Sequence, residues 1–317
     1  MASANDKSIL ITGGAGFIGS YLCEYFVKEG YLVICVDNLI TGKEENIAFL
    51  LKEKNFKFLK EDVNESDFHF LNNVNLFAIL HFASPASPKD YFKYPLLTLK
   101  TNALATYRLL ELAKEKKAIF FLASTSEVYG DPQVSPQSEE YWGYVNPCGL
   151  RSVYDEGKRF AESLVMAYHR QYSLSVRIAR IFNTYGPRMR EDDGRVIPNF
   201  INQALKNEDI TIYGDGYQTR SFCYIDDLVS GLVKLFYSDY CQPINLGNPN
   251  EIKIIDLAKM IIDLTKSNSK IIYLPPYPDD PHRRCPDIKK AKTILGWEPK
   301  ISLKEGLLKT IDYFKSF

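Results

Sequence analysis

The chain has 317 residues, of which 45% are hydrophobic and 25% charged, and its formal net charge at pH 7 is zero. This length can bury a sizeable core in one large or two modest domains. The balanced charge argues against a nucleic-acid or membrane-surface partner, and no apolar run approaches the roughly 18 to 20 residues of a membrane span. A strand-like segment follows "MASANDK" at once and leaves no room for a signal peptide, so we expect a cytoplasmic protein.

The cysteines and histidines give no sign of a metal site. The six cysteines stand at positions 23, 35, 148, 223, 241 and 285 without CxxC spacing, and the four histidines are scattered. We therefore expect reduced, mostly buried thiols and no bound metal.

Short β-rich runs alternate with helical stretches in the first half of the chain. Strands are predicted at "SILIT", "YLVICVD", "FKFLK", "FAILHFA", "AIFFLAS" and "SVRIARI", and helices over residues 17–29, 44–53, 96–115 and 153–172. Such alternation is typical of βαβ units around a parallel sheet. We predict an α/β fold: a Rossmann-type doubly wound parallel sheet over residues 1–180, and a smaller C-terminal substrate-binding lobe over 181–317. The strand-like "INLGNP" predicts that a segment near 240–265 returns to the first domain.

A glycine-rich turn follows the first predicted strand. "ILITGGAGFIGSYL" places Gly13, Gly16 and Gly19 where the backbone can approach a pyrophosphate at a helix N-terminus. Asp37 ends the second strand, where a carboxylate accepts hydrogen bonds from a ribose 2′-hydroxyl and repels the 2′-phosphate of NADP. NAD is therefore the predicted cofactor, although the glycines could serve only helix–strand packing. The other predicted cofactor contacts are Phe17, Ile18, Asn38, Asp62, Val63, Tyr154 and Lys158.

Three hydroxyls and a glutamate follow the strand "AIFFLAS". Ser124, Thr125, Ser126 and Glu127 stand where ligands of α/β sheets bind, beyond the carboxyl end of a strand. A helix cap rich in serine and threonine is the structural alternative. The position and the residue types together make this cluster a candidate catalytic site.

Tyr154 and Lys158 stand four residues apart in "YDEGK", on one face of a predicted helix. An ammonium within a few ångströms favours a phenolate, so Lys158 is expected to lower the pKa of Tyr154. Tyr154 is then the candidate general base, and Thr125 is expected to hydrogen-bond the same substrate oxygen.

These motifs resemble those of the extended short-chain dehydrogenase/reductases that act on nucleotide sugars. The resemblance covers essentially the whole chain and includes "TGGAGFIG" and "YGDGYQTRSFCYIDD". Within that superfamily, "HFASPASPKDY", "STSEVYGDP", "NPCGLRSVYDEGKR", "IFNTYGPRM" and "PDIKKAKTILGWEP" look very like the UDP-glucuronate decarboxylases, which make UDP-xylose. The resemblance implies a Rossmann domain, tightly held NAD and oxidation at the sugar's 4-position.

Rival activities on the same scaffold are nucleotide-sugar 4,6-dehydratases and 4-epimerases. The dehydratases carry Asp–Glu where this chain has Ser126–Glu127, and their aspartic acid protonates the departing 6-hydroxyl. Serine is a poor acid, and a decarboxylase needs none, because a 4-ketone makes the sugar carboxylate a β-keto acid. Glu127 could assist carboxylate departure, position a water, or serve only as a helix-start acid. A non-catalytic NAD-binding regulator would tolerate loss of Tyr154 or Lys158, and this chain keeps both.

The resemblance also implies which residues bind the UDP-sugar and that the protein forms a homodimer. Asn183 and Arg220 are expected near the diphosphate, Tyr213 and Gln218 near the uridine, and Tyr91 and Arg284 near the sugar carboxylate. Arg188 is a further candidate, since a guanidinium grips phosphate or carboxylate with two hydrogen bonds. Cys285 stands where the family pattern has lysine, which puts the geometry beside Arg284 in doubt. A homodimer through helices 96–115 and 153–172 is the expected assembly.

Overall fold

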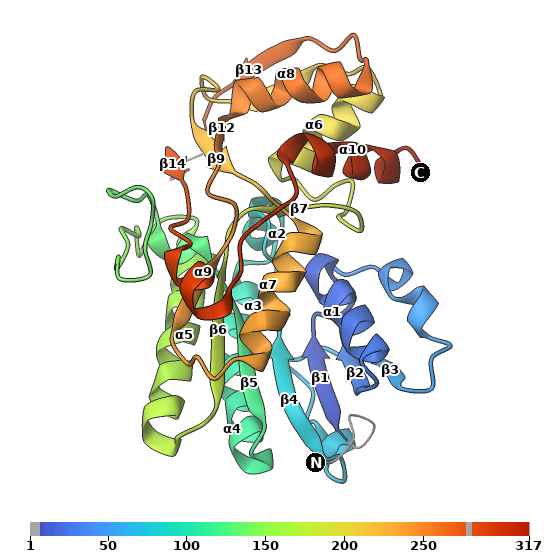
Figure 1. The fold of residues 1–317 in the computed structure, drawn as a ribbon, viewed down its shortest axis with the longest axis vertical. Coiled ribbons are helices and arrows are strands. Elements are labelled where there is room, and N and C mark those ends of the chain that lie inside the picture. Colours follow the sequence, from blue (N-terminus) through green and yellow to red (C-terminus); the bar gives the residue numbers. More distant parts are fainter. Residues whose placement is uncertain (1–6, 277–280, 317) are drawn as a thin grey trace.

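The computed structural model describes residues 7–276 and 281–316, and its centre is a seven-stranded sheet (Figure 1). The strand order is β11-β6-β5-β4-β1-β2-β3, and every neighbouring pair is parallel. The strands are β1 (Ser8–Thr12), β2 (Leu32–Val36), β3 (Phe56–Leu59), β4 (Leu76–His81), β5 (Ile119–Thr125), β6 (Val176–Ile181) and β11 (Pro243–Leu246). The predicted doubly wound fold is confirmed. The late strand β11 pairs with β6 at one edge of the sheet, whereas the exact division into two domains stays a prediction.

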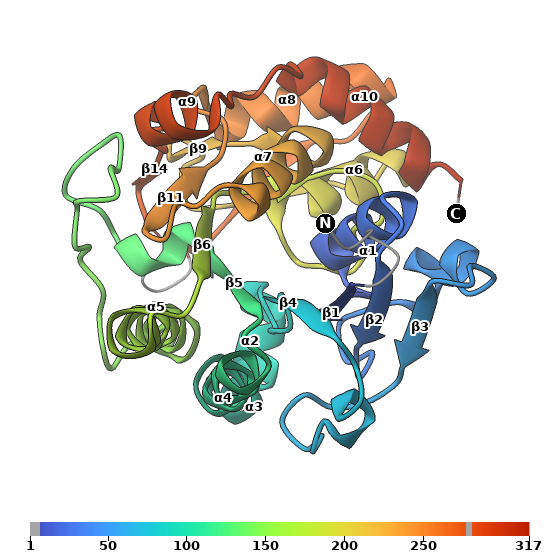
Figure 2. The same cartoon turned by 60° about the horizontal axis from the view of Figure 1, so that its bottom comes forward.

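Helices cover both faces of this sheet, as Figure 2 shows. On one face lie α1 (Phe17–Lys28) and α7 (Ile225–Tyr237), and on the other α4 (Thr106–Lys116) and α5 (Ser152–Tyr172). Strand β1 explains the two layers, because successive side chains point to opposite faces. Ile9 and Ile11 enter one hydrophobic core and Leu10 enters the other, all fully buried.

Two predicted helices differ from the observed structure. Residues 44–53 form two short 3₁₀ turns, Glu44–Asn46 and Ala48–Leu50, and the Asn46 side chain donates to the Ala15 carbonyl at 3.0 Å. The predicted helix over 96–115 is divided into α3 (Pro95–Lys100), a π-helical turn (Thr101–Ala105) and α4. Thr101 donates its hydroxyl to the Leu97 carbonyl at 2.9 Å, and such side-chain bonds compete with the regular helix ladder.

The C-terminal part of the chain lies beyond the carboxyl ends of the strands, at the top of Figure 1. Its helices are α6 (Val196–Leu205), α8 (Ile254–Thr265) and α10 (Leu303–Phe314), and α9 (Lys289–Leu295) packs on α7 and β11. Its small sheets pair β7 (Thr184–Tyr185) with β10 (Cys223–Tyr224), β8 (Ile210–Tyr213) with β13 (Ile271–Leu274), and β9 (Thr219–Ser221) with β12 (Glu251–Lys253) and β14 (Arg283–Arg284). Across residues 7–276 and 281–316, no helix is long and apolar enough to cross a membrane. The cytoplasmic location stays a prediction.

Candidate active site

One cavity of about 670 Å³ lies between the carboxyl ends of the strands and the C-terminal part. It brings together almost every site residue that the sequence predicted. These are Gly13, Gly16, Phe17, Ile18, Gly19, Asp37, Asn38, Asp62, Val63, Tyr91, Thr125, Ser126, Glu127, Tyr154, Lys158, Asn183, Arg188, Tyr213, Gln218 and Arg220. Arg284 differs, because it lies behind Glu127 and does not line the cavity.

The glycine-rich turn is shaped for close approach of a ligand. Gly13 has φ +73°, and a Cβ atom there would lie 2.6 Å from the backbone nitrogen of Ala83. Gly16 ends the turn as the N-cap of α1, so the first amides of that helix point to the cavity. Glycines let the backbone N–H groups at a helix N-terminus approach an anion closely, so this turn can bind a pyrophosphate.

Asp37 braces this turn from the end of β2. Its two carboxylate oxygens accept hydrogen bonds from the Ala15 amide at 3.0 Å and the Leu39 amide at 2.8 Å. Burial raises the pKa of Asp37 above its usual value, which those amides partly offset. The neighbouring residue Asn38 donates to Asp62 at 3.0 Å. Asp37, Asn38 and Asp62, all predicted to contact the cofactor, therefore line the same part of the cavity wall.

Lys158 and Tyr154 lie deep in the cavity, on adjacent turns of α5. The Lys158 ammonium donates to the Ala123 carbonyl at 2.8 Å and lies 5.8 Å from the centroid of the Tyr154 ring. Burial lowers the pKa of Lys158 to about 7. Burial and the charge of Glu127 raise the pKa of Tyr154, and the side chain of Thr125 lowers it by hydrogen bonding. The expected depression of the Tyr154 pKa is therefore not met in this structure, since burial and the charge of Glu127 outweigh the hydrogen bond of Thr125.

The residues of the hydroxyl cluster after β5 have different contacts, some of them structural and some at the cavity. Thr125 caps the 3₁₀ turn Ser126–Tyr129, where its hydroxyl accepts from the Glu127 amide at 3.2 Å. Ser124 instead points to Glu162 and donates to its carboxylate at 2.5 Å. The helix cap thus accounts for Thr125, and Ser124 has a structural contact with Glu162, whereas Ser126 and Glu127 line the cavity and are held by arginines.

Two arginines hold Glu127 from opposite sides. Arg151 binds one carboxylate oxygen at 2.5 Å, and Arg284 binds the other while donating to the Gly130 carbonyl at 2.6 Å and to the Ser126 hydroxyl at 3.3 Å. These guanidinium charges outweigh burial and hold the pKa of Glu127 at about 2. Glu127 is therefore a neutralised anion that can accept hydrogen bonds but does not supply a proton at neutral pH.

Three of the predicted substrate residues, Tyr213, Gln218 and Arg220, line the cavity from the C-terminal part of the chain. The Gln218 side chain donates to the Tyr213 carbonyl at 2.6 Å, and Arg220 donates to the Thr219 carbonyl at 2.9 Å. Arg188 lies at the other end, paired with Glu24 of α1 at 2.5 Å. The roles assigned to these residues stay predictions; Arg188, a candidate for the phosphate or carboxylate of the substrate, pairs with α1 of the cofactor side.

Sequence reasoning missed residues that the structure makes central. Arg151 lies one turn before Tyr154, and this spacing was the available signal. Asp90 and Arg190 line the cavity as an ion pair, 100 residues apart in the chain, which no local pattern reveals.

Comparison with known proteins assigns the family. The family model described as GDP-mannose 4,6 dehydratase matches residues 10–310. UDP-glucuronic acid decarboxylase 1 of Xenopus tropicalis is 51% identical over 315 residues, which cover 99% of this chain and 74% of that protein. The chain belongs to the UDP-glucuronic acid decarboxylases. The predicted family and enzyme class are confirmed.

Solved structures of relatives show that other activities of this family share the scaffold. A Bacillus cereus UDP-glucuronic acid 4-epimerase, in complex with UDP-glucuronic acid and NAD, superimposes with a TM-score of 0.89 at 33% identity. A Thermotoga maritima UDP-glucose 4-epimerase with UDP-glucose has a TM-score of 0.90 at 31% identity. Each match covers 98% of this chain and 99% of the other. The fold alone therefore does not distinguish a decarboxylase from an epimerase.

Proposed function

We propose that this chain decarboxylates UDP-glucuronate to UDP-xylose, with NAD as a bound cofactor that is reduced and reoxidised in each turnover. The observation that carries the proposal is the pair Ser126–Glu127. A dehydratase needs an acid beside the departing 6-hydroxyl, but Ser126 is a hydroxyl and Glu127 is held ionised by Arg151 and Arg284. Neither of these two side chains has an acidic proton to give to a leaving hydroxide at neutral pH, and loss of carbon dioxide requires none.

The first half of the reaction oxidises the sugar. NAD, when bound, accepts the hydride from carbon 4. Tyr154 removes the proton of the 4-hydroxyl, and Thr125 hydrogen-bonds the same oxygen. Because burial raises the pKa of Tyr154, its phenolate depends on the positive charge of Lys158, 5.8 Å from the ring centroid. The glycine-rich turn and Asp37 hold the cofactor, and the carboxylate of Asp37 disfavours a 2′-phosphate.

The second half follows from the ketone at carbon 4. The carboxylate is then part of a β-keto acid, so the bond between carbons 5 and 6 breaks, and its electron pair forms an enolate. Carbon 5 takes a proton from solvent, and the hydride returns to carbon 4 as Tyr154 gives back its proton. We assign to Glu127, which lines the cavity, the role of orienting the water that delivers the proton.

The remaining site residues fix the substrate. Asn183 and Arg220 hold the diphosphate, and Tyr213 and Gln218 hold the uridine. Tyr91 and Arg284 serve the sugar carboxylate, Arg284 by fixing Ser126 and Glu127 from behind.

The test is the fate of UDP-glucuronate with the purified protein. We expect carbon dioxide, UDP-xylose and no accumulation of NADH, and in heavy water one deuterium at carbon 5. If one NADH and one UDP-4-keto-pentose appear for each carbon dioxide, the decarboxylation stands but the product is not UDP-xylose. No carbon dioxide, together with a 4-keto-6-deoxy sugar from UDP- or dTDP-glucose, would overturn the proposal.

We also propose a homodimer through α3, α4 and α5, which pack side by side. Leu96 of α3, Leu104 of the π-helical turn between α3 and α4, and Phe160 of α5 are 72%, 59% and 51% exposed. A second copy would bury this apolar face. Leu104→Asp is expected to give monomers in light scattering, whereas Leu308→Asp, at an exposed leucine of α10, leaves the mass unchanged. A monomeric wild type would contradict the dimer.

A further inference from the structure

The segment 187–195, called the strap here, crosses the cavity between β7 and α6. Most of its residues line the cavity. Its first residues are fastened to the cofactor side: the Tyr21 hydroxyl donates to the Pro187 carbonyl at 3.3 Å, and Arg188 pairs with Glu24. The strap therefore starts beside α1, the helix that the glycine-rich turn opens.

The middle of the strap is fastened to α2 (Pro88–Lys93), on the other side of the cavity. One nitrogen of Arg190 donates to both carboxylate oxygens of Asp90, at 2.9 and 2.8 Å, and the two side chains are only 14% and 10% exposed. Ser87 also donates to Asp90 at 2.8 Å and fixes the carboxylate. Lys89 pairs with Asp192 at 3.1 Å, but both are more than half exposed, and such pairs contribute little.

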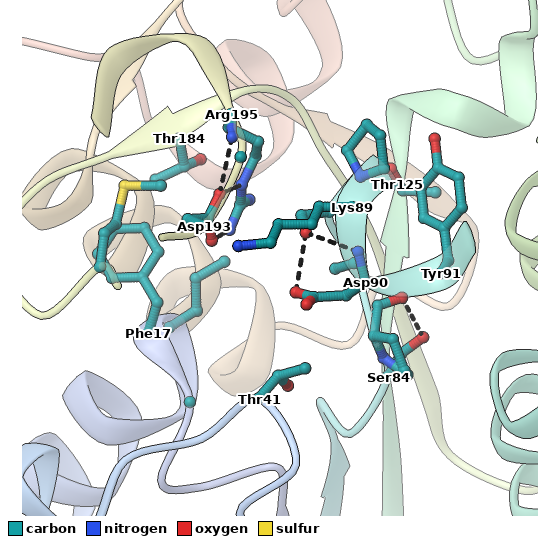
Figure 3. Close-up of a pocket in the computed structure, with 18 of the residues that line it drawn as sticks. Phe17, Thr41, Ser84, Lys89, Asp90, Tyr91, Thr125, Thr184, Asp193 and Arg195 are labelled. Carbon is teal, nitrogen blue, oxygen red and sulfur yellow. Dashed lines mark hydrogen bonds and ion pairs between the residues drawn. The ribbon is translucent and has the colours of Figure 1, made fainter. Parts of the chain in front are cut away.

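Close backbone packing shows that the strap lies directly against α2. Gly194 has φ +88°, and a Cβ atom there would lie 2.9 Å from the Lys89 Cβ. Figure 3 shows Asp90 between Phe17, at the start of α1, and Thr125, at the end of β5. Asp90 and Arg190 therefore line the same cavity as the cofactor turn and the catalytic cluster.

We propose that the Asp90–Arg190 pair keeps the strap closed while the sugar is a 4-ketone, and so commits the hydride to return to carbon 4. This inference rests on the proposed decarboxylation. If the strap opens early, UDP-glucuronate and NAD⁺ give a free UDP-4-keto-pentose, carbon dioxide and NADH. If it stays closed, NADH and a proton reduce the ketone to UDP-xylose. Asp90 and Arg190 are thus positioning residues that determine the product.

The test compares Asp90→Asn, Arg190→Gln and the double variant with the wild type. Arg190→Gln removes the ion pair of the buried Asp90 carboxylate, and Asp90→Asn leaves Arg190 only its longer pair with the exposed Asp192, at 3.4 Å, so each single change is expected to open the strap. We expect the NADH released per carbon dioxide to rise at least tenfold, and the dissociation of bound NAD without substrate to accelerate at least tenfold. Because both residues act through one contact, the double variant is expected to change these quantities no more than either single variant.

Two further variants keep the test decisive. Lys292→Ala breaks an exposed ion pair with Glu298, far from the cavity, and is expected to behave as the wild type. Arg190→Lys keeps the charge but has no planar guanidinium, so the NADH released per carbon dioxide is expected to lie between the values of the wild type and Arg190→Gln. If Arg190→Gln or Asp90→Asn fails to fold, the comparison of Arg190→Lys with the wild type is the test. If the variants fold, release carbon dioxide, and keep the wild-type NADH ratio and NAD dissociation rate, the inference is wrong. A wild type that releases no carbon dioxide would instead overturn the proposed function.

Discussion

The ring of Tyr91 lies parallel to the ring of Tyr154, with centroids 5.3 Å apart and planes 8° apart. Tyr91 comes from α2 and Tyr154 from α5, so this stack joins the helix that anchors the strap to the helix that carries the candidate base. The Tyr91 hydroxyl is buried and has no hydrogen-bond partner among residues 7–276 and 281–316. A buried, unpaired hydroxyl in the cavity is a group that a polar substrate can satisfy.

Tyr154→Phe keeps this stack and removes the hydroxyl. We expect the turnover of UDP-glucuronate to fall by about 10² to 10⁴, the usual contribution of a general base. Binding of NAD is expected to stay unchanged, as measured by cofactor content. Tyr168→Phe on the same helix is the control, since its hydroxyl bonds Glu111 outside the cavity. Near-normal turnover of Tyr154→Phe would remove this residue from the mechanism.

The cofactor released by denaturing the purified protein is expected to be NAD(H). Asp37 is buried at the cavity wall, and its carboxylate would repel a 2′-phosphate. Chromatography of the released nucleotide is the measurement. Recovery of mainly NADP(H) would mean that Asp37 serves only to brace the Ala15 and Leu39 amides.

Much of the site was predictable because its signals are local. The glycine-rich turn, the Tyr154–Lys158 spacing and the hydroxyls after β5 each depend on a few consecutive residues, and the parallel sheet brings their ends together. The neutralisation of Glu127 was not predictable in this way. Its partners Arg151 and Arg284 lie 24 and 157 residues away, and only the fold places Arg284 behind β5.

The errors in the predicted elements have the same origin. Residues 44–53 have a helical composition, but Asn46 is drawn to the Ala15 and Arg188 carbonyls and the segment forms short turns. In the segment 96–115, the hydroxyls of Thr101 and Thr106 bind carbonyls of the preceding turn around the π-helical residues. In both segments, hydrogen bonds of side chains thus change the local structure that the helical pattern of the sequence predicts.

Ser126→Asp tests the residue that separates decarboxylation from dehydration. The new carboxylate would compete with Glu127 for Arg284 and repel the sugar carboxylate, by about 4 kcal/mol for unit charges ~4 Å apart at an effective dielectric of about 20. We expect the KM for UDP-glucuronate to rise by at least tenfold. Ser126→Ala is the control, because it removes the hydroxyl without adding charge and is expected to have a smaller effect on KM. An unchanged KM in Ser126→Asp would show that this side chain does not face the carboxylate.

Glu127→Gln removes the charge that Arg151 and Arg284 share. Breaking a buried ion pair from one side costs about 3–5 kcal/mol, so the variant is expected to be less stable than the wild type at pH 7. The pKa of Glu127 is lowered to about 2 in the folded protein, from an ordinary value of 4.5. A carboxyl with a lowered pKa contributes stability above its unfolded value, and loses it as the pH falls through the folded value.

The difference in unfolding free energy between wild type and Glu127→Gln is therefore expected to narrow as the pH falls from about 4.5 to about 2. Denaturant unfolding across this range is the measurement. Glu111→Gln is the control, because its ion pair with Lys114 is partly exposed and its loss costs about 1 kcal/mol or less. A constant difference between wild type and Glu127→Gln over this range would mean that Arg151 and Arg284 do not hold Glu127 ionised, and the argument against a proton-donating Glu127 would be lost with it.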